Sequence, residues 1–225
     1  MTVYDKELPA NLNESLESML MQTYPPEELV LVCDGALTCE LNIIAKSFQS
    51  EFRDTIKIIR TDENAGAGTA NNAGIKACSC PIIIKMDSDD ISLPDRCAKQ
   101  IMLFAMHPEL DIVGTFVEEF DSGTGETVSI KKMPVKQEQI LKYARRRNPF
   151  NRQTIAFKKA AAVKAGGYSD LKLCEDYEFI VRMLQNGAVG QNIPETLVRY
   201  RTYGGDFKKR GSWTVSYTHL RAHAT

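Results

Sequence analysis

The chain has 225 residues, of which 43% are hydrophobic, and its 28 Lys and Arg against 29 Asp and Glu give a net charge of −1. This length suits one large α/β domain or two small ones, and the balanced charge excludes the strongly basic footprint of a protein that binds nucleic acid or an anionic membrane. No apolar run approaches the roughly 20 residues of a membrane span, and Asp5, Lys6 and Glu7 interrupt any apolar signal segment at the start.

Strand and helix patterns alternate in the first part of the chain. Apolar residues at helical spacing from Leu12 to Leu20 predict a helix that Asn11 or Asn13 caps and that Pro25 stops. The sequence then predicts a strand at Leu29–Cys33, a helix at Leu41–Phe48, a strand at Ile56–Ile59, a helix at Ala70–Ala77 and a strand at Ile82–Met86. Continuous Val, Ile and Leu runs are typical of strands buried on both faces. These elements therefore predict an α/β fold with a mostly parallel sheet flanked by helices.

The pattern becomes less regular after residue 92. The sequence predicts a helix at Leu93–Met106, a hairpin of Ile112–Phe120 and Thr127–Ile130 around Ser122 and Gly123, a helix at Val135–Arg146, a strand at Thr154–Phe157, a helix at Tyr177–Leu184 and a strand at Thr196–Tyr200. No internal repeat or low-complexity linker divides these elements.

Three carboxylates are gathered where the apolar run at 82–86 ends, at Asp87, Asp89 and Asp90. Like charges about 4 Å apart repel by roughly 4 kcal/mol in a partly screened site, so a hard divalent cation bound through oxygen would relieve them. Ligands also bind at the carboxyl ends of strands in open α/β sheets. The residues alone leave two interpretations open: a metal site serving a phosphate-bearing substrate, or an acidic turn that caps the helix beginning near Pro94.

The glycine-rich loop from Asn64 to Asn71 raises the question of a dinucleotide-binding turn, because Gly-x-Gly before a helix can form one. Asn71 stands at the position of the third glycine, and the loop follows the third predicted strand instead of the first. A dehydrogenase fingerprint is therefore excluded on both counts.

A set of short motifs stands in a specific order and spacing: Met1-Thr-Val-Tyr-Asp-Lys-Glu7, Gln22-Thr-Tyr24, Val32-Cys-Asp-Gly35, Asn64-Ala-Gly-Ala-Gly68, Asn72-Ala-Gly74, Met86-Asp-Ser-Asp-Asp-Ile-Ser92, Arg147-Asn-Pro149, Gly166-Gly-Tyr168 and Glu175-Asp-Tyr177. With these motifs the chain resembles the family 2 glycosyltransferases with the GT-A fold, and more closely their bacterial exopolysaccharide members of the amylovoran type, from about residue 1 to 211. The resemblance implies one GT-A domain over 1–212, with a Rossmann-like nucleotide-sugar-binding half at 1–92 and an irregular acceptor-side half at 93–212. Residues 213–225 have no counterpart in the family and are interpreted as an atypical tail of foreign origin.

The resemblance also implies a donor site. Asp34 would accept a hydrogen bond from the base edge of the nucleotide, and Gly35 would let the backbone approach closely. Asp87 would hold the ribose, and Asp89, with Asp87, would bind Mn²⁺ or Mg²⁺, which bridges to the diphosphate. Asp90 would be either a second ligand or a cap of the following turn. The other implied donor contacts are Asn64, Gly66, Asn71 and Asn72.

On the acceptor side, Asp176 matches the family's general base, which takes the proton of the attacking hydroxyl, and Glu175 would orient the acceptor or the base. A helix N-terminus also attracts acidic residues, so a simple cap of the helix at Tyr177–Leu184 stays open for Asp176. Arg147, Arg152 and Arg201 would contact phosphates or the acceptor. One departure concerns Arg152, because relatives usually carry histidine in the segment that here reads Asn-Arg-Gln-Thr over 151–154.

The expected function is inverting, metal-dependent transfer of a sugar from a nucleotide-diphosphate sugar, in the first place a UDP-sugar, to a glycan or lipid-linked acceptor in cell-surface polysaccharide biosynthesis. The expected location is cytoplasmic, at the inner face of the plasma membrane, where peripheral association is compatible with the sequence and nucleic acid is no partner. The six cysteines contain no C-x-x-C pair, which is typical of reduced thiols in a cytoplasmic protein.

Two alternatives come from other classes. A sugar-phosphate nucleotidyltransferase would need a Gly-rich, Arg- or Lys-bearing loop on its first strand, where this chain has Asp5-Lys-Glu-Leu-Pro9. An inactive nucleotide-binding fragment is the second alternative, because only Thr2, Val3 and Tyr4 are available for the first strand before Asp5.

Overall fold

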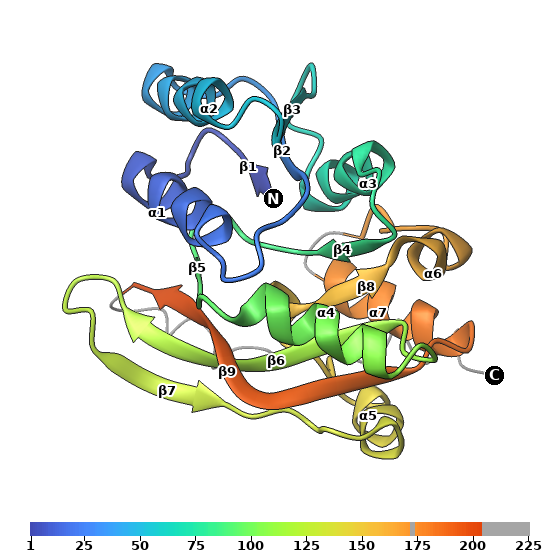
Figure 1. The fold of residues 1–225 in the computed structure, drawn as a ribbon. Coiled ribbons are helices and arrows are strands. Elements are labelled where there is room, and N and C mark those ends of the chain that lie inside the picture. Colours follow the sequence, from blue (N-terminus) through green and yellow to red (C-terminus); the bar gives the residue numbers. More distant parts are fainter. Residues whose placement is uncertain (172–173, 204–225) are drawn as a thin grey trace.

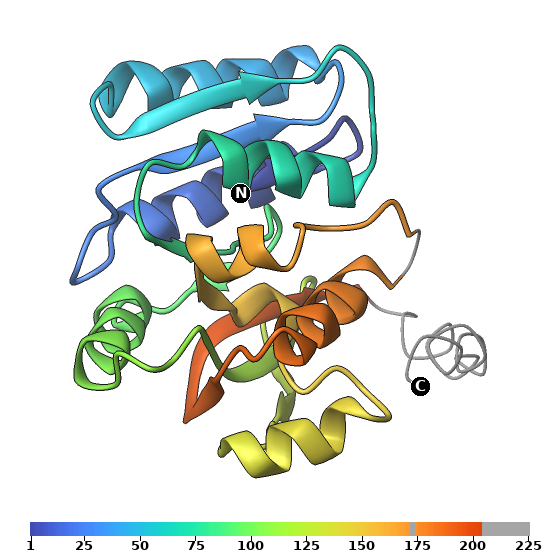
Figure 2. The same ribbon diagram turned by 90° about the vertical axis from the view of Figure 1, so that its right-hand side faces the viewer.

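The first sheet consists of three parallel strands near the N-terminus. In a computed structural model that describes residues 1–171 and 174–203, β1 (Thr2–Val3), β2 (Leu29–Cys33) and β3 (Ile56–Arg60) lie in the order β1-β2-β3. Every residue of β2 is buried, as its continuous apolar sequence predicts for the central strand of a covered sheet. Figure 2 shows β2 and β3 running side by side in the same direction.

Helices cover both faces of this sheet (Figure 1). α1 (Pro9–Leu20) and α2 (Cys39–Glu51) share one core with Leu29 and Leu31 of β2. α3 (Ala67–Ala77) packs on the other side, where Ala70 joins Val30 and Val32. Alternate residues of β2 therefore serve opposite faces, as the pleat of a strand requires. The predicted helix-flanked parallel sheet is confirmed for this part of the chain.

A second sheet follows and is mainly antiparallel. Its strands lie in the order β4 (Ile82–Ile84), β8 (Ala156–Lys158), β6 (Ile112–Asp121), β9 (Gly190–Thr202) and β5 (Ile91–Ser92), and β7 (Thr127–Lys131) pairs with β6. β6 and β9 are parallel, whereas the other pairs are antiparallel. A parallel bridge between Thr2 and Asp87 joins the two sheets. The acidic segment 87–90 thus lies at their junction.

Four further helices and one 3-10 turn complete the described fold: α4 (Arg96–Met106), α5 (Gln137–Ala144), η1 (Arg152–Thr154), α6 (Lys159–Lys164) and α7 (Glu175–Gln185). Phe157 of β8 meets Phe179 of α7 edge to face, and Tyr168 stacks on Phe179 with ring centroids 4.2 Å apart. This aromatic core fixes α7 against the second sheet. Figure 1 shows α5 at the lower end of the molecule, opposite α2.

Several predicted boundaries are wrong for local reasons. α1 begins at Pro9, because proline is well suited to the first helical position; Asn11 therefore lies inside the helix, where its amide donates to Tyr203 Oη at 2.7 Å. α7 begins at Glu175, two residues before the predicted start, so Glu175 and Asp176 belong to its first turn. β9 extends from Gly190 to Thr202, well beyond the predicted Thr196–Tyr200. β5 and α6 were absent from the prediction.

Other expectations concern absences and the end of the chain. All six cysteines are free thiols, as expected. Across 1–171 and 174–203, none of the helices combines the length and the apolar character needed to cross a bilayer. The tail predicted at 213–225 lies outside the described residues.

Candidate active site

Two carboxylates that are far apart in the sequence meet through two cations. Lys85 Nζ lies 2.6 Å from Asp87 Oδ1 and 3.8 Å from Asp176 Oδ1. Arg152, in the turn η1, places Nε 3.9 Å from Asp87 Oδ2 and Nη1 3.7 Å from Asp176 Oδ2. We call Lys85, Asp87, Arg152 and Asp176 the charge cluster. It joins the end of β4 to the first turn of α7, so it unites the predicted donor side with the predicted acceptor side.

Burial makes the charges of the cluster depend on one another. The side chains of Lys85 and Asp176 are only 10% and 11% exposed, whereas that of Arg152 is 50% exposed. Burial alone would raise the pKa of Asp87, but Lys85 and Arg152 outweigh it and lower that pKa to about 2. Burial alone would lower the pKa of Lys85, but Asp176 and Asp87 raise it. Both Lys85 and Asp87 are therefore charged at neutral pH, and the exposed guanidinium of Arg152 is the member that can meet a ligand.

Asp176 keeps one buried oxygen without a hydrogen bond. Within the described residues neither its Oδ1 nor the buried hydroxyl of Tyr168 has a hydrogen bond of standard geometry, although the Tyr168 hydroxyl and the Asp176 carboxylate lie close enough to interact. Burial, and then the charge of Asp176, raise the pKa of Tyr168 well above its usual value, so the phenol is neutral. Buried oxygens are nearly always hydrogen-bonded, so this oxygen is an exception whose partner the described residues do not supply. Glu175, the half-buried first residue of α7, lies next to it in the chain.

The other two carboxylates of the acidic segment differ in their surroundings. Asp90 is fully buried, its Oδ1 accepts the backbone N–H of Arg201 at 3.0 Å, and its Oδ2 lacks a hydrogen-bond partner in the described chain. Burial, and then the charges of Asp87 and Asp89, raise the pKa of Asp90 well above its usual value. Burial, and then the charges of Asp87 and Glu7, raise the pKa of Asp89 to about 6. Asp90 is therefore bound to the backbone of β9 and does not cap α4. The residue that precedes α4 is Asp95.

We expect Asp90→Asn to raise the melting temperature by a few degrees at about pH 8 in the presence of a chelator. The folded state raises the pKa of Asp90, so ionising it costs stability increasingly as the pH rises from the unfolded towards the folded pKa. Asparagine keeps an oxygen for the Arg201 N–H and removes the charge. About 1 kcal/mol moves the melting temperature of a domain this size by roughly 2–4 °C. Thermal melts at about pH 8 and pH 4 check this, because the gain must shrink at the lower pH; a variant less stable at the higher pH contradicts it.

Arg201 fixes the acidic segment in place. Its Nε donates to the carbonyl oxygen of Asp89 at 2.8 Å, its Nη2 pairs with Glu14, and its guanidinium lies 4.9 Å from the centroid of the Phe120 ring. The residue is only 8% exposed. These contacts give Arg201 a positioning role for residues 89–90, and its contact with a phosphate stays a prediction.

Asp34 lies where the sequence placed it, at the end of β2, but its carboxylate already organises the neighbouring loop. Its Oδ1 accepts the N–H of Ala65 at 2.9 Å and its Oδ2 accepts that of Gly66 at 3.1 Å. The hydroxyl of Thr61 donates to Oδ1 at 3.3 Å. Asp34 thus holds the start of α3, and its contact with a nucleotide base stays a prediction.

We expect Gly35→Ala to destabilise the fold by about 1–3 kcal/mol. Gly35 has φ +79°, and a Cβ there would lie 2.8 Å from the backbone nitrogen of Asn64. Gly125 is a matched control, since its φ is +74° and an added Cβ would meet nothing within 4 Å. Urea unfolding of both alanine variants separates the close approach from the backbone conformation. If both variants lose the same free energy of unfolding, the close approach of Gly35 to Asn64 does not contribute to the destabilisation.

Asn72 joins α3 to the turn before α7. Its amide donates to the carbonyl oxygen of Tyr168 and accepts the N–H of Tyr168, both at 2.8 Å. A Cβ on Gly167 would lie 2.4 Å from Asn72 Oδ1, so glycine is needed there. The other predicted donor contacts lie nearby in the chain: Gly66 is the N-cap of α3 with φ +88°, Asn71 is half-buried, and Asn64 is exposed. Their contacts with a nucleotide stay predictions.

Lys85 and Tyr168 belong to the site but were not predicted as site residues from the sequence. Arg147 was predicted as a contact but lies apart from the charge cluster. Lys85 was counted within an apolar run, although a lysine two residues before Asp87 was a usable signal. Tyr168 was quoted only as part of a motif. Arg147 is exposed in the turn after α5, and its side chain makes no ion pair within the described part of the chain. Arg152 and Asp176 are the acceptor-side candidates that the structure brings together.

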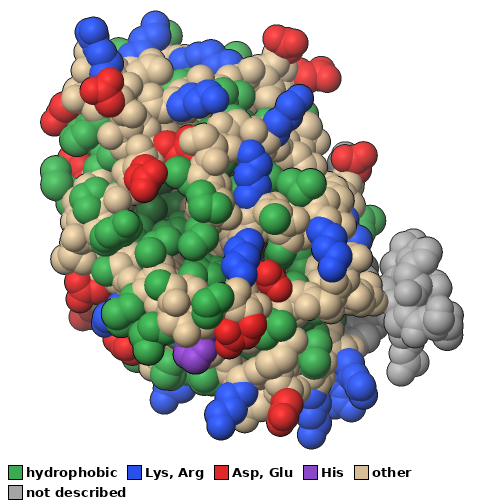
Figure 3. All heavy atoms as spheres, turned by 45° about the vertical axis from the view of Figure 1, so that its right-hand side comes forward, with side chains coloured by type: hydrophobic (Ala, Val, Ile, Leu, Met, Phe, Trp, Pro, Cys, Tyr) green, Lys and Arg blue, Asp and Glu red, His purple; other side chains and the backbone are tan. Residues whose placement is uncertain are grey.

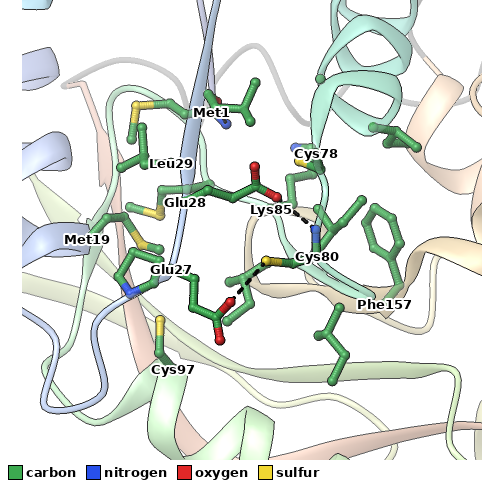
Figure 4. Close-up of a pocket in the computed structure, with 18 of the residues that line it drawn as sticks. Met1, Met19, Glu27, Glu28, Leu29, Cys78, Cys80, Lys85, Cys97 and Phe157 are labelled. Atoms are coloured by element: carbon green, nitrogen blue, oxygen red, sulfur yellow. Dashed lines mark hydrogen bonds between the residues drawn. The ribbon is translucent and has the colours of Figure 1, made fainter. Parts of the chain in front are cut away.

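A cavity of about 310 Å³ lies beside the cluster and has a different chemistry. Figure 4 shows Met19, Leu29, Cys97 and Phe157 around it, with Lys85 at its edge. Glu28, also at its border, accepts the N–H of Cys80 at 2.9 Å. Its lining is mainly apolar and includes none of the carboxylates at 87–90 or 176, but Lys85, Tyr168 and Asn71 border both the cavity and the candidate active site.

A metal ion at this site would need ligands from the substrate in addition to those of the protein. No group of three or more His, Cys, Asp or Glu side chains in residues 1–171 and 174–203 is arranged to hold a metal ion. Mg²⁺ usually binds through one or two carboxylates together with substrate phosphates, so few protein ligands suffice. The carboxylate of Asp89, whose pKa is raised by burial and by the charges of Asp87 and Glu7, fits such a site.

Comparisons with known proteins agree on one family. The family model described as Glycosyl transferase family 2 matches residues 1–168. The chain is 34% identical to an Escherichia coli UDP-Gal:alpha-D-GlcNAc-diphosphoundecaprenol beta-1,3-galactosyltransferase, over 99% of this chain and 80% of the relative. It is 35% identical to the amylovoran biosynthesis glycosyltransferase AmsE of Erwinia amylovora, over 94% of this chain and 78% of the relative.

Solved structures agree on the fold. The S. aureus TarS structure is similar with a TM-score of 0.70 and 18% identity, over 92% of this chain and 37% of that one. TarS in complex with UDP gives a TM-score of 0.67 at 16% identity, covering 92% and 62%. The Pyrobaculum calidifontis mannosyltransferase PcManGT in complex with GDP-Man and Mn²⁺ gives 0.66 at 16% identity, covering 88% and 55%. The chain spans less than two thirds of each of these solved chains, and the likeness confirms the predicted GT-A architecture.

Proposed function

The chain belongs to glycosyl transferase family 2, and from this premise we propose that it is an inverting glycosyltransferase that moves a sugar from a UDP-sugar to a glycan or lipid-linked acceptor. The proposed setting is cell-surface polysaccharide biosynthesis at the cytoplasmic face of a membrane. The E. coli relative, which acts on a diphosphoundecaprenol-linked sugar, and the Erwinia relative, which acts in amylovoran biosynthesis, support a lipid-linked acceptor and polysaccharide biosynthesis.

The charge cluster carries the proposal, because it places a candidate base beside the donor-side carboxylate. Asp176 would take the proton of the acceptor hydroxyl while the hydroxyl oxygen forms its bond to the anomeric carbon. The bond between that carbon and the diphosphate oxygen breaks, and UDP leaves with the electron pair. Attack from the face opposite the leaving group inverts the anomeric carbon. Arg152, exposed between Asp87 and Asp176, would bind the diphosphate.

Lys85 would keep the cluster in its working charge state. Its ammonium lies between Asp87 and Asp176, and it lowers the pKa of Asp87, so it favours the ionised form of that carboxylate. An ionised Asp176 is required of a base, and an ionised Asp87 is required to hold the ribose hydroxyls. Asp34 and the loop that it organises would lie under the base of the nucleotide, with Gly35, Asn64, Gly66, Asn71 and Asn72.

Asp89, together with Asp87, would hold Mn²⁺ or Mg²⁺. The bound cation would supply Lewis-acid stabilisation of the leaving diphosphate. The raised pKa of Asp89 supports this assignment, because a carboxylate that is unfavourable as an isolated anion is favourable beside a divalent cation. The Mn²⁺ in the PcManGT complex gives independent support from the same fold.

The proposal is tested by incubating the purified chain with UDP-sugars, Mn²⁺ and a lipid-linked or free glycan acceptor, and by determining the anomeric configuration of the product by NMR. Transfer with inverted configuration is expected. Retained configuration would overturn the inverting mechanism. Synthesis of a nucleotide-sugar from a sugar phosphate and a nucleoside triphosphate would favour the nucleotidyltransferase, and UDP binding without any transfer would favour the inactive fragment.

A further inference from the structure

Basic residues are concentrated in one exposed segment, although the whole chain is electrically balanced. Between residues 131 and 147, seven residues are Lys or Arg and a single one, Glu138, is acidic, whereas the chain as a whole has 28 basic and 29 acidic residues. Lys132, Lys142 and Arg145 are exposed and form no ion pair with any residue in 1–171 or 174–203. The overall net charge therefore conceals a local positive surface.

Apolar side chains are exposed among these charges. On α5, Leu141 is 43% exposed and Tyr143 is 37% exposed; on β7, Ile130 is 54% exposed. Figure 3 shows Lys and Arg side chains at the lower end of the molecule, where Figure 1 places α5, and also along its middle and at its upper end. We call the exposed side chains of β7, residues 131–136 and α5 through Arg145 the basic face. A soluble polyanion would bind the basic side chains but would not bury the apolar ones, whereas the headgroup region of a bilayer can bind both kinds of side chain.

The basic face is attached to the acceptor side of the charge cluster. The hydroxyl of Tyr177 in α7 donates to the carbonyl oxygen of Ala144, the last residue of α5, at 2.5 Å. Tyr177 follows Asp176 directly in the first turn of α7. The end of α5 is therefore held next to the helix turn that carries the candidate base.

We propose that the basic face is a docking surface for an anionic lipid bilayer. Charge complementarity selects anionic lipid headgroups, and Leu141, which lies four residues before Arg145 and so on the same side of α5, would enter the boundary between headgroups and acyl chains. Docking through this face sets the first turn of α7 near the bilayer, where a lipid-linked acceptor would present its sugar. In this respect the inference rests on the proposed function, but lipid binding itself is measured without donor, acceptor or turnover.

The test is vesicle flotation of the full chain with phosphatidylcholine vesicles and with vesicles of phosphatidylcholine mixed with phosphatidylglycerol. Binding is expected only to the anionic vesicles, and it should weaken at high salt. The triple variant Lys132→Gln, Lys142→Gln, Arg145→Gln should bind about 100-fold more weakly, since each basic residue near an anionic surface contributes measurably. Leu141→Ser should weaken binding by about tenfold.

A matched control removes three exposed basic residues from the opposite end of the molecule, Lys46→Gln, Arg53→Gln, Arg60→Gln. This control should bind within about twofold of wild type. Thermal melts confirm that all variants fold, which these exposed positions allow. Equal binding to neutral and anionic vesicles, the absence of binding by wild type, or equal loss in both triple variants would each overturn the docking surface. If the wild-type chain transfers sugar to a soluble acceptor but does not bind anionic vesicles, the docking surface is wrong and the proposed function still stands.

Discussion

Replacing Asp176 by asparagine should lower the rate of sugar transfer by about 10²- to 10⁴-fold while UDP affinity stays close to wild type. Asparagine keeps the shape of the side chain but cannot accept the proton of the acceptor hydroxyl. It also leaves Lys85 and Arg152 paired with Asp87, so the donor side of the cluster keeps its charges. Transfer rates and UDP titration by calorimetry on both proteins provide the comparison.

Glu40→Gln is a suitable control for this experiment. Glu40 is an exposed acid in the first turn of α2, so the same change of acid to amide is made at a helix start away from the cluster. Transfer should be unaffected there. If Asp176→Asn preserves transfer, Asp176 only stabilises the start of α7, because asparagine interacts well with helix N-termini. Loss of UDP binding would instead assign Asp176 to the nucleotide site.

Removing the carboxylate of Asp89 should weaken UDP binding in the presence of Mn²⁺ by about 10²- to 10³-fold. An opposite charge at about 4 Å is worth roughly 4 kcal/mol in a partly screened site, and each factor of ten in affinity corresponds to about 1.4 kcal/mol. Calorimetric titration of UDP into wild type and Asp89→Ala, each with Mn²⁺ and with chelator, should give strong binding only for wild type with metal.

Asp62→Ala serves as the matched control, since Asp62 is an exposed aspartate in the loop before α3. Its affinity for UDP should match that of wild type with and without metal. Equal affinity of Asp89→Ala and wild type under both conditions would remove the cation from donor binding. Metal-dependent binding that survives in Asp89→Ala but disappears in Asp87→Ala would transfer the role to Asp87.

Elements with a strong local pattern could be predicted from the sequence. β2 was predicted at its observed bounds, because Leu29–Cys33 is a continuous apolar run buried on both faces. The hairpin of β6 and β7 followed from two β-rich runs around Ser122 and Gly123. β9 was predicted far too short, because polar residues in its first part, such as Asn192, are stabilised by distant segments: the Asn192 amide donates to the carbonyl oxygens of Pro134 at 2.7 Å and Pro149 at 3.0 Å. β5 has two residues and exists through its pairing with β9.

The same distinction holds for the site. Asp87 and Asp176 could be singled out by their motifs, but their shared cations depend on the packing of β4, η1 and α7. Arg152 looked like a departure from the family, yet it completes the cluster. Arg96 was not singled out at all, although it is fully buried and its Nη2 donates to the carbonyl oxygens of Lys85 at 2.6 Å and Gln153 at 3.2 Å. Such roles depend on contacts between distant segments, which local patterns do not encode.

The position of β9 constrains how the protein can be made. β9 is the last described strand of the chain, yet it lies inside the second sheet, between β6 and β5, and pairs with β6 along its whole length. While the ribosome synthesises the residues between Asp121 and Gly190, the edge of β6 that later pairs with β9 has no partner strand. Unpaired strand edges favour association with other chains, and late, non-local pairing slows folding. Nascent chains released before β9 emerges should therefore be the species that chaperones bind, and the folded enzyme should appear only after translation has passed Thr202.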